Sequence, residues 1–345
     1  MDKADLYTLD DFFAIKKVDA HLHYYTSNTC FLKLAKQFNT HLVSINVDFL
    51  EDEWMALNKQ TNIARQLKGE SPSDFSFIGA VPMRQELNED VIIKACLQIK
   101  KEKKNGAIGV KIWKNVGMKI TFNNQLVMID HPLFDPLLNK LTDIDLPLLG
   151  HFGEPRNCWL PLEEMTVESD KRYFSSHPEF HMYLHPEFPS YEKQIEASNR
   201  MLAKNPKLRF IGAHLGSSEY SIDEIAKRLD AFPNMYMDMA ERVCHLQYQA
   251  AENHQAVYDF MIRYQDRLLY GSDMVFTDNK TEKEQVEEVK SRWLNQWAFF
   301  TQQDIQSTWE VNKSFRGLGL PKLVIDKIYY QNALKAYPLL TMVLR

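Results

Sequence analysis

Four histidines and one aspartate stand where short β-rich runs of this sequence end. His21 and His23 close the first run, and His151, His214 and Asp273 each close a later one. Imidazole nitrogens and carboxylate oxygens are suitable ligands for Zn²⁺, Mn²⁺ or Fe²⁺. A site with few protein ligands keeps positions open for water or substrate, which is typical of catalytic metals. Any one of these histidines is as readily a hydrogen-bonded core residue, whereas the whole set favours a metal site.

Eight runs must position these residues, and each is rich in β-forming residues and ends in turn or polar residues. They cover residues 15–23, 41–48, 75–82, 107–113, 146–153, 208–216, 234–240 and 267–273. Stretches with helical spacing of apolar residues lie between most of them, for example residues 90–106, 191–206 and 222–234. Asn or Pro near the end of each stretch indicates a helix stop before the next strand.

Strands that alternate with helices predict a parallel α/β sheet of βαβ units. Eight units in 345 residues fit one closed (β/α)8 TIM barrel, regular or distorted, as a single domain over residues 1–345. An open doubly wound sheet is the alternative, but no GxGxxG or GxxxxGKS/T phosphate loop is present. Residues 154–190 are interpreted as an insertion, or lid, after the fifth strand, and residues 274–345 as the source of the closing helices.

In such a barrel the carboxyl ends of the strands gather at one mouth, where active sites lie. Residues two apart on a strand point to the same face, so His21 and His23 are both expected to face the axis. By the same rule Asp19 is expected to share that face and to orient a ligand histidine. His151, His214 and Asp273 would meet the pair from three other strands.

Composition and charge exclude several classes of protein. Hydrophobic residues make up 45% and charged residues 25%, which is typical of a globular enzyme and too apolar for disorder. The net charge of −5 and the lack of a basic block argue against a nucleic-acid partner. No run approaches the roughly 18–20 apolar residues of a membrane span. The acidic N-terminus lacks the apolar core of an export signal, which predicts a cytoplasmic protein.

At the motifs that carry these residues, the sequence resembles the amidohydrolase superfamily. Within it, the chain is similar to the amidohydrolase 2 branch, the group of aminocarboxymuconate semialdehyde decarboxylase and γ-resorcylate decarboxylase. The matching pieces are "VDAHLH", "GVKIW", "LLGHFGEP", "FIGAHLGSS", "NMYMDMA", "LLYGSDMVF" and "IYYQNALKAY". They span nearly the whole chain, and they are specific to the superfamily rather than to one reaction.

The resemblance implies a role for each residue of the set. His21, His23, His151 and Asp273 match the family's metal ligands. His214 matches a histidine that acts on the substrate or on the metal-bound water in one-metal members. In two-metal members the corresponding histidine binds the second ion.

Lys111, in "GVKIW", bears on the number of metal ions. Two-metal members of the superfamily carry a carboxylated lysine that bridges both ions at about this position. The other interpretation is an ordinary lysine that pairs with a carboxylate or with the substrate. We expect one divalent ion, with Zn²⁺ first, and keep two ions with a carboxylated Lys111 as the alternative.

Two reactions fit this predicted site. In the first, a metal-activated water attacks an amide, ester or lactone of a small molecule, with Asp273 as general base and His214 polarising the carbonyl. In the second, the same site decarboxylates a small carboxylic acid, with His214 or Asp273 moving the proton. Hydrolysis is the commoner outcome across the superfamily and is expected first, with the lyase as the alternative.

Non-catalytic roles are also open to a barrel of this kind. A binding module is disfavoured by the complete ligand set, since a degenerate site usually lacks a ligand. Nothing in the sequence favours a purely structural oligomer. Barrels in this branch often dimerise, so the expected partners are a small-molecule substrate and a second copy of the chain, with no membrane partner.

Further residues near the predicted mouth are candidates for substrate binding. Arg156 follows the fifth strand and suits a substrate carboxylate or, equally, a surface ion pair. Trp113 and Trp159 would wall the pocket or pack in the core. Glu241 and Arg242 follow the seventh strand and would contact the substrate or each other.

The insertion also carries His177, His181 and His185, which are spaced as on one helical face. Pro178 and Pro186 argue against one continuous helix. Packing or solvent-facing roles are therefore expected ahead of a second metal site. The four cysteines form no CxxC pair, which predicts free thiols.

Overall fold

The computed structural model describes residues 5–50 and 56–344, so the first four residues of the acidic N-terminus lie outside the described residues. Within this part of the chain, nine strands form one parallel sheet, ordered β10-β9-β8-β7-β4-β3-β2-β1-β11. These strands are β1 (Lys17–Tyr24), β2 (Thr40–Ile45), β3 (Phe75–Ala80), β4 (Val110–Ile112), β7 (Leu148–Gly150), β8 (Phe210–Gly212), β9 (Met235–Asp238), β10 (Leu268–Leu269) and β11 (Val275–Phe276). Each predicted run overlaps one strand of this sheet, and β11 follows the last run.

The eighth strand is interrupted and closes the barrel in two parts. β10 pairs with β9, whereas β11 pairs with β1 at the other end of the strand order. Between them, the backbone N–H of Ala20 donates to Tyr270 O at 3.0 Å, and that of Asp273 donates to His21 O at 2.7 Å. The two edges of the sheet therefore join, and the predicted (β/α)8 barrel is confirmed.

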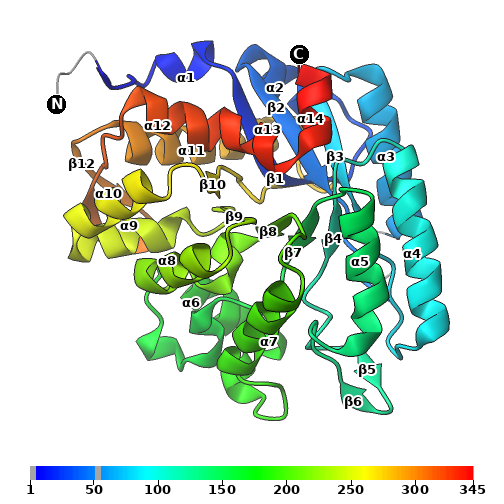
Figure 1. Ribbon diagram of the computed structural model, residues 1–345. Helices are drawn as coiled ribbons and strands as arrows, with labels where there is room; N and C mark the ends of the chain where they lie inside the picture. The colour runs from blue at the N-terminus through cyan, green and yellow to red at the C-terminus, as the bar shows by residue number, and fades with distance from the viewer. Residues whose placement is uncertain (1–4, 51–55, 345) are drawn as a thin grey trace.

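Helices surround the strands, which lie at the centre of Figure 1. They are α2 (Cys30–Gln37), α3 (Leu57–Glu70), α4 (Glu89–Lys104), α5 (Asp135–Asp143), α7 (Tyr191–Lys204), α8 (Ile222–Ala231), α9 (Val243–Glu252), α10 (His254–Arg263) and α11 (Glu282–Thr301), with α1 (Asp11–Ala14) before the first strand. The predicted helical stretches 90–106, 191–206 and 222–234 correspond to α4, α7 and α8. Asn88, Ser190 and Ser221 cap them by accepting a backbone N–H three residues on.

The C-terminal segment closes one end of the barrel. It runs through α12 (Lys322–Asp326), the π-helical turn η9 (Lys327–Gln331), α13 (Asn332–Ala336) and α14 (Pro338–Leu344). Ala333, Ala336 and Tyr337 join the apolar cluster that fills the barrel interior. A Cβ on Gly109, just before β4, would lie 3.3 Å from the Tyr337 ring. The closure is therefore at the amino ends of the strands, opposite the predicted mouth.

Asn332 anchors this closing segment to the barrel. It is fully buried, and its Nδ2 donates to Gln265 O at 2.7 Å and to Leu268 O at 2.8 Å. Asn332→Ala leaves one buried and one partly buried carbonyl without this donor, so we expect it to lower the free energy of unfolding by about 2–4 kcal/mol. Urea titration measures the loss. Asn295→Ala, on the surface of α11, is the control, and an equal effect of the two variants would contradict this anchoring role.

A β-bulge in β1 changes which side chains face the axis. The pairing of β1 with β2 shifts register between Asp19 and Leu22. Before the shift, Val18 and Ala20 belong to the interior cluster, and after it Leu22 belongs to the outer core under the helices. His21 follows Ala20 directly and also faces inward, as its contacts at the mouth show.

The bulge overturns the prediction for Asp19. Its side chain faces the outer helices, where Oδ2 accepts from Trp293 Nε1 at 2.9 Å and Oδ1 accepts from Ser272 N at 3.0 Å. It reaches His21 only at the backbone N–H, at 3.4 Å. The prediction that Asp19 orients a ligand histidine is wrong, because strand alternation does not hold across the extra residue.

Residues 154–190 leave the barrel after β7 and form short helices over its mouth. These are η4 (Arg156–Trp159), η5 (Leu162–Glu164), α6 (Glu168–Ser176), η6 (Pro178–Phe180) and η7 (Met182–Leu184). Cys158, Met165, Phe174 and Met182 form a small core of their own. Two hairpins, β5 (Thr121–Phe122) with β6 (Gln125–Leu126) and β12 (Ile305–Thr308) with β13 (Val311–Arg316), complete the strands, and η3 (Pro132–Phe134) precedes α5.

Two further features can be compared with the sequence: the state of the cysteines and the presence of membrane-spanning helices. All four cysteines are free thiols, as expected. Across residues 5–50 and 56–344, no helix has both the length and the apolar character that crossing a membrane requires.

Candidate metal centre

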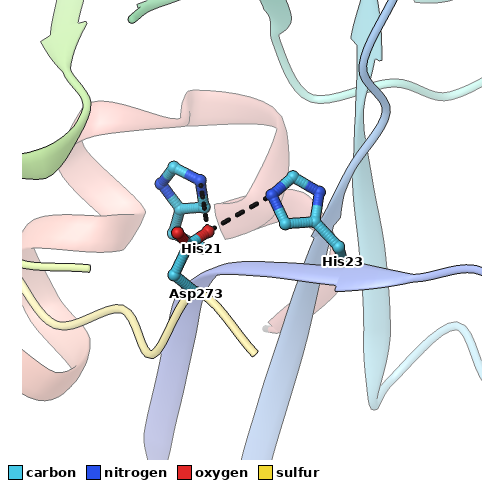
Figure 2. A group of neighbouring side chains, drawn as sticks. All are labelled: His21, His23 and Asp273. Carbon is cyan, nitrogen blue, oxygen red and sulfur yellow. Dashed lines mark ion pairs between the residues drawn. The ribbon is translucent and has the colours of Figure 1, made fainter. Parts of the chain in front are cut away.

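Three side chains meet at the carboxyl end of the barrel. His21 and His23 come from β1, and Asp273 lies at the interruption between β10 and β11. His21 Nε2 and His23 Nε2 lie 3.3 and 3.2 Å from the same atom, Asp273 Oδ1. Figure 2 shows both rings directed at this carboxylate. Gly271 permits the close approach, since a Cβ there would lie 2.7 Å from His21 Cβ.

Hydrogen bonds determine which nitrogen of each imidazole carries hydrogen. His21 Nδ1 lies 2.8 Å from Asp238 Oδ2, and His23 Nδ1 lies 2.8 Å from Ile45 O. Carboxylate and carbonyl oxygens only accept, so both Nδ1 atoms donate and both Nε2 atoms present lone pairs to Asp273. Asp273 Oδ1 has no hydrogen-bond donor among the described residues. These converging lone pairs fit a divalent cation between the three groups.

Lys111 of β4 lies at the edge of this group. Its buried Nζ is 3.3 Å from His21 Nε2. Burial lowers the pKa of Lys111 from 10.5 to about 8, and the nearby Asp273 and Asp238 oppose that shift. The lysine therefore stands beside the predicted metal position, where the sequence led us to expect it.

His214 approaches the group from the end of β8. Its ring centroid lies 4.8 Å from that of His21, and its Nδ1 lies 3.9 Å from Asp273 Oδ2. Nδ1 donates to Ala240 O at 2.9 Å, which leaves Nε2 as the accepting nitrogen. Burial lowers the pKa of His214 from 6.5 to about 3. The imidazole is therefore neutral at pH 7, with a lone pair on Nε2.

The backbone that carries His214 is left-handed over the whole turn η8 (His214–Ser217). The φ angles are 58° at His214, 55° at Leu215, 62° at Gly216 and 57° at Ser217. This conformation costs roughly 1–2 kcal/mol for each residue other than glycine. Space also requires Gly216, because a Cβ there would lie 2.8 Å from Arg228 Nη1. Such strain persists only where surrounding contacts hold it in place.

Asp238, at the end of β9, is the functional residue that sequence reasoning missed. Besides its contact with His21, its Oδ1 accepts from the backbone N–H of His214 at 2.9 Å and of Ala240 at 3.2 Å. The carboxylate thus orients the His21 imidazole and holds the start of the turn at His214. The signal was present in "NMYMDMA", where Asp238 is the acidic residue at the end of a predicted strand.

His151 stands beside His214 and outside the group of three. It follows β7, and its ring centroid lies 4.4 Å from that of His214. Burial lowers the pKa of His151 well below 6.5, and its Nδ1 has no hydrogen-bond partner among the described residues. Its role as a fourth metal ligand therefore stays a prediction.

A pocket of about 560 Å³ opens over the centre. Strand ends, the insertion and α11 supply its walls, and its lining includes Trp113, Glu241 and Arg242 from the predicted substrate-binding set. A larger groove of about 660 Å³ lies between α4 and α5 on the outer layer, and none of the predicted site residues lines it. The predicted site therefore opens into the smaller pocket.

Arg156 and Trp159 of the same predicted set do not line this pocket. The Arg156 guanidinium lies between the rings of Tyr191 and Tyr220, 5.3 and 5.2 Å from their centroids, and pairs with Glu192 at 3.1 Å. Trp159 packs edge-on against Tyr191. The structure thus gives these two residues the packing and ion-pair roles that were their alternatives.

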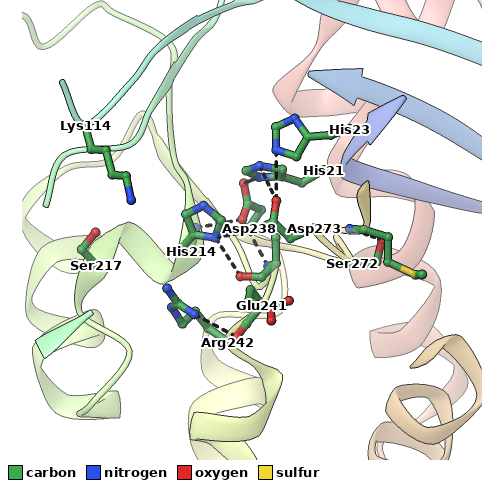
Figure 3. A network of polar contacts seen from close by, with 12 residues as sticks. His21, His23, Lys114, His214, Ser217, Asp238, Glu241, Arg242, Ser272 and Asp273 are labelled. Carbon is green, nitrogen blue, oxygen red and sulfur yellow. Dashed lines mark hydrogen bonds and ion pairs between the residues drawn. The ribbon is translucent and has the colours of Figure 1, made fainter. Parts of the chain in front are cut away.

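Glu241 and Arg242 face the pocket with different partners, as Figure 3 shows for their positions near His214. The Glu241 carboxylate pairs with Arg292 of α11. Arg242 donates to the backbone oxygen of Glu241 at 3.1 Å, and its nearest carboxylate is Asp170 of α6, at 4.0 Å. The two side chains therefore do not pair with each other.

The three histidines of the insertion each bond a backbone carbonyl. His177 contacts Tyr173 O, His181 contacts Leu160 O and His185 contacts Pro178 O, all within 3.0 Å. The prolines divide their segment into separate short helices, as predicted. Within the described residues, the groups able to hold a metal contain only His21, His23, His214, Asp238 and Asp273.

A closed (β/α)8 barrel with a histidine and aspartate cluster at its mouth defines the class of this protein. The amidohydrolase family model matches residues 18–339, nearly the whole chain. The chain belongs to the amidohydrolase family. No curated protein matched it in a search of their sequences.

Solved structures agree with the fold at low sequence identity. A 2,6-dihydroxybenzoate decarboxylase from Rhizobium has 14% identity and a TM-score of 0.56, with 94% of this chain and 99% of that one covered. A 4-oxalomesaconate hydratase from Rhodopseudomonas palustris has 12% identity and a TM-score of 0.53, with 95% and 97% covered. A 5-carboxyvanillate decarboxylase from Novosphingobium aromaticivorans, solved with manganese, has 12% identity and a TM-score of 0.51, with 98% and 99% covered.

Proposed function

We propose that this protein is a metal-dependent hydrolase that cleaves an amide, ester or lactone bond of a small molecule. The observation that carries the proposal is the convergence of the Nε2 atoms of His21 and His23 on Asp273 Oδ1. A bound divalent ion would lower the pKa of a coordinated water toward about 7 and polarise a carbonyl oxygen. Zn²⁺ suits these nitrogen and oxygen donors, and so does Mn²⁺, the ion in the 5-carboxyvanillate decarboxylase structure.

We propose that the site holds one metal ion rather than two. The second group of possible ligands, His21, His214 and Asp238, shares His21 with the first. Asp238 already accepts from His21 Nδ1 and from two backbone N–H groups. Its oxygens therefore serve to orient, and two ions bridged by a carboxylated Lys111 remain the alternative.

The residues of the chain divide the proton transfers between them. Asp273 would hold the ion and would accept one proton from the attacking water. His214 Nε2 would receive that proton from Asp273 and pass it to the leaving group, since its Nδ1 is committed to Ala240 O. This assignment makes His214 an acceptor, whereas polarising a carbonyl would require it to donate. The pocket of about 560 Å³ suits a small-molecule substrate.

Non-oxidative decarboxylation is the second candidate, and Arg242 favours it. Three other cations that line the pocket have close carboxylates: Lys114 pairs with Glu154, Arg292 with Glu241 and Lys280 with Glu288. Lys111 instead contacts His21 Nε2, at 3.3 Å. Arg242 is 4.0 Å from its nearest carboxylate, and its buried Nε has no partner among the described residues. A guanidinium in this state is suited to a carboxylate of the substrate.

Removal and return of the metal tests the proposal. We expect the purified protein to hold about one equivalent of a transition metal by mass spectrometry, as a mononuclear site implies. Chelation should abolish turnover of a compound found in a panel of esters, lactones, amides and aromatic acids, and Zn²⁺ or Mn²⁺ should restore it. Release of CO2 would identify the lyase instead. A protein that binds no metal would overturn both candidates.

A further inference from the structure

The left-handed turn η8 places His214 in the site and is held from outside the barrel. Tyr191 of α7 donates its hydroxyl to Ser217 O at 2.5 Å, and Ser217 Oγ donates to Gly153 O at 2.8 Å. Arg228 of α8 donates to Gly216 O and, at 3.2 Å, to Ser218 Oγ. Arg228 thus contacts the turn directly at Gly216, two residues beyond His214, and also contacts Ser218 just after the turn.

Arg228 reaches the turn from a fixed position between two helices. Its Nε donates to Asn199 Oδ1 at 2.9 Å and its Nη2 donates to Ser198 Oγ at 3.1 Å, both on α7. The side chain is 5% exposed. The guanidinium therefore ties α7, α8 and the turn together through donors on all three of its nitrogens.

The charge of Arg228 is not neutralised by an ion pair within the described residues. All four of its hydrogen-bond acceptors are neutral, and no carboxylate of residues 5–50 and 56–344 forms an ion pair with it. A buried charge of this kind is unfavourable for folding, and an apolar residue of similar size would have a smaller desolvation penalty. The guanidinium instead offers a planar fork of donors with fixed directions.

We propose that Arg228 is a positioning residue for the proposed reaction, which fixes the left-handed turn so that the His214 imidazole keeps its orientation toward Asp273. The expected effect on kcat rests on the proposed function, whereas the expected effect on the position of His214 does not. Arg228 lies outside the group of metal ligands, so its loss should leave metal binding intact. Misplacement of His214 should then lower kcat, while KM stays close to that of the wild type.

Nuclear magnetic resonance of labelled histidines tests the positioning without any substrate. The His214 signal is assigned from its loss in His214→Asn. In Arg228→Ala we expect this signal to shift and broaden, while the signals of His41 and His254, remote from the turn, stay in place. Guanidinium ion, kept well below unfolding concentrations, should restore the signal, because Arg228 lines a surface depression of about 350 Å³ between α7 and α8.

Kinetics provides the second measurement. A misplaced catalytic group costs about 10²-fold, so kcat of Arg228→Ala should fall by about that factor and recover in part with guanidinium ion. Arg267→Ala is the matched control, because its half-buried guanidinium also donates to backbone carbonyls, those of Phe232 and Met235, but does not touch the turn. Arg228→Lys keeps the charge without the fork and should recover little.

Two results would overturn the inference. One is a His214 signal and a kcat that are unchanged in Arg228→Ala. The other is an equal change at all histidines and the same loss in Arg267→Ala, which would assign Arg228 to general stability. A protein that binds no metal would remove the proposed reaction, yet the His214 signal would still report whether Arg228 holds the turn.

Discussion

Asp273→Asn is expected to lower turnover by about 10³-fold, within the range for loss of a general base. The amide of asparagine cannot accept the proton of the attacking water at neutral pH. It also removes the negative charge toward which the Nε2 atoms of His21 and His23 point, at 3.3 and 3.2 Å. Steady-state kinetics on the compound identified in the panel, together with metal analysis of the variant, measures both losses.

Asp266→Asn is the control for this substitution. Asp266 precedes the same interrupted strand but lies at the opposite end of the barrel, where it pairs with Lys327 and Lys335. Its variant should retain full turnover. Wild-type turnover in Asp273→Asn would show that the mechanism proposed above is wrong.

Asp238→Asn is expected to weaken metal binding by about 10–100-fold, as is typical when a group that orients a ligand is replaced. The Asp238 carboxylate accepts on both oxygens, from His21 Nδ1 and from the backbone N–H of His214 and Ala240. Either orientation of an amide places an NH2 group against one of these donors. Since the backbone N–H groups can only donate, the amide oxygen should face them and its NH2 group should face His21 Nδ1. His21 would then carry hydrogen on Nε2, which removes the lone pair that a metal needs.

Competition with a chromophoric chelator measures this affinity. Asp259→Asn, an exposed change on α10, serves as the matched control and should bind metal like the wild type. Equal affinity in Asp238→Asn and the control would refute the orienting role. Retained affinity with lowered kcat would assign Asp238 to the turn at His214 alone.

The barrel could be predicted from the sequence because its signals are local. Each strand is a short apolar run, and each helix has its own period and stop. His21, His23, His214 and Asp273 could be placed together for a related reason: the barrel brings the ends of its strands to one mouth.

Residues whose roles depend on direction rather than on position were harder to predict. Asp19 lies on the expected strand, but the bulge after it turns its side chain to Trp293. Arg156 lies close to His151 in sequence, but packing between two tyrosines holds it elsewhere. The role of Asp238 could not be predicted, because a lone acidic residue at a strand end does not indicate which histidine it will contact.

The extra residue in β1 makes one strand serve two environments. Up to Ala20, the inward positions belong to an apolar packing layer, whereas His21 contacts Asp273 and His23 lines the polar pocket above it. Without the extra residue, alternation from Val18 and Ala20 would continue to Leu22, and both histidines would turn outward. The polar pocket of this barrel therefore depends on a change of parity in β1 as much as on the identity of the residues that line it.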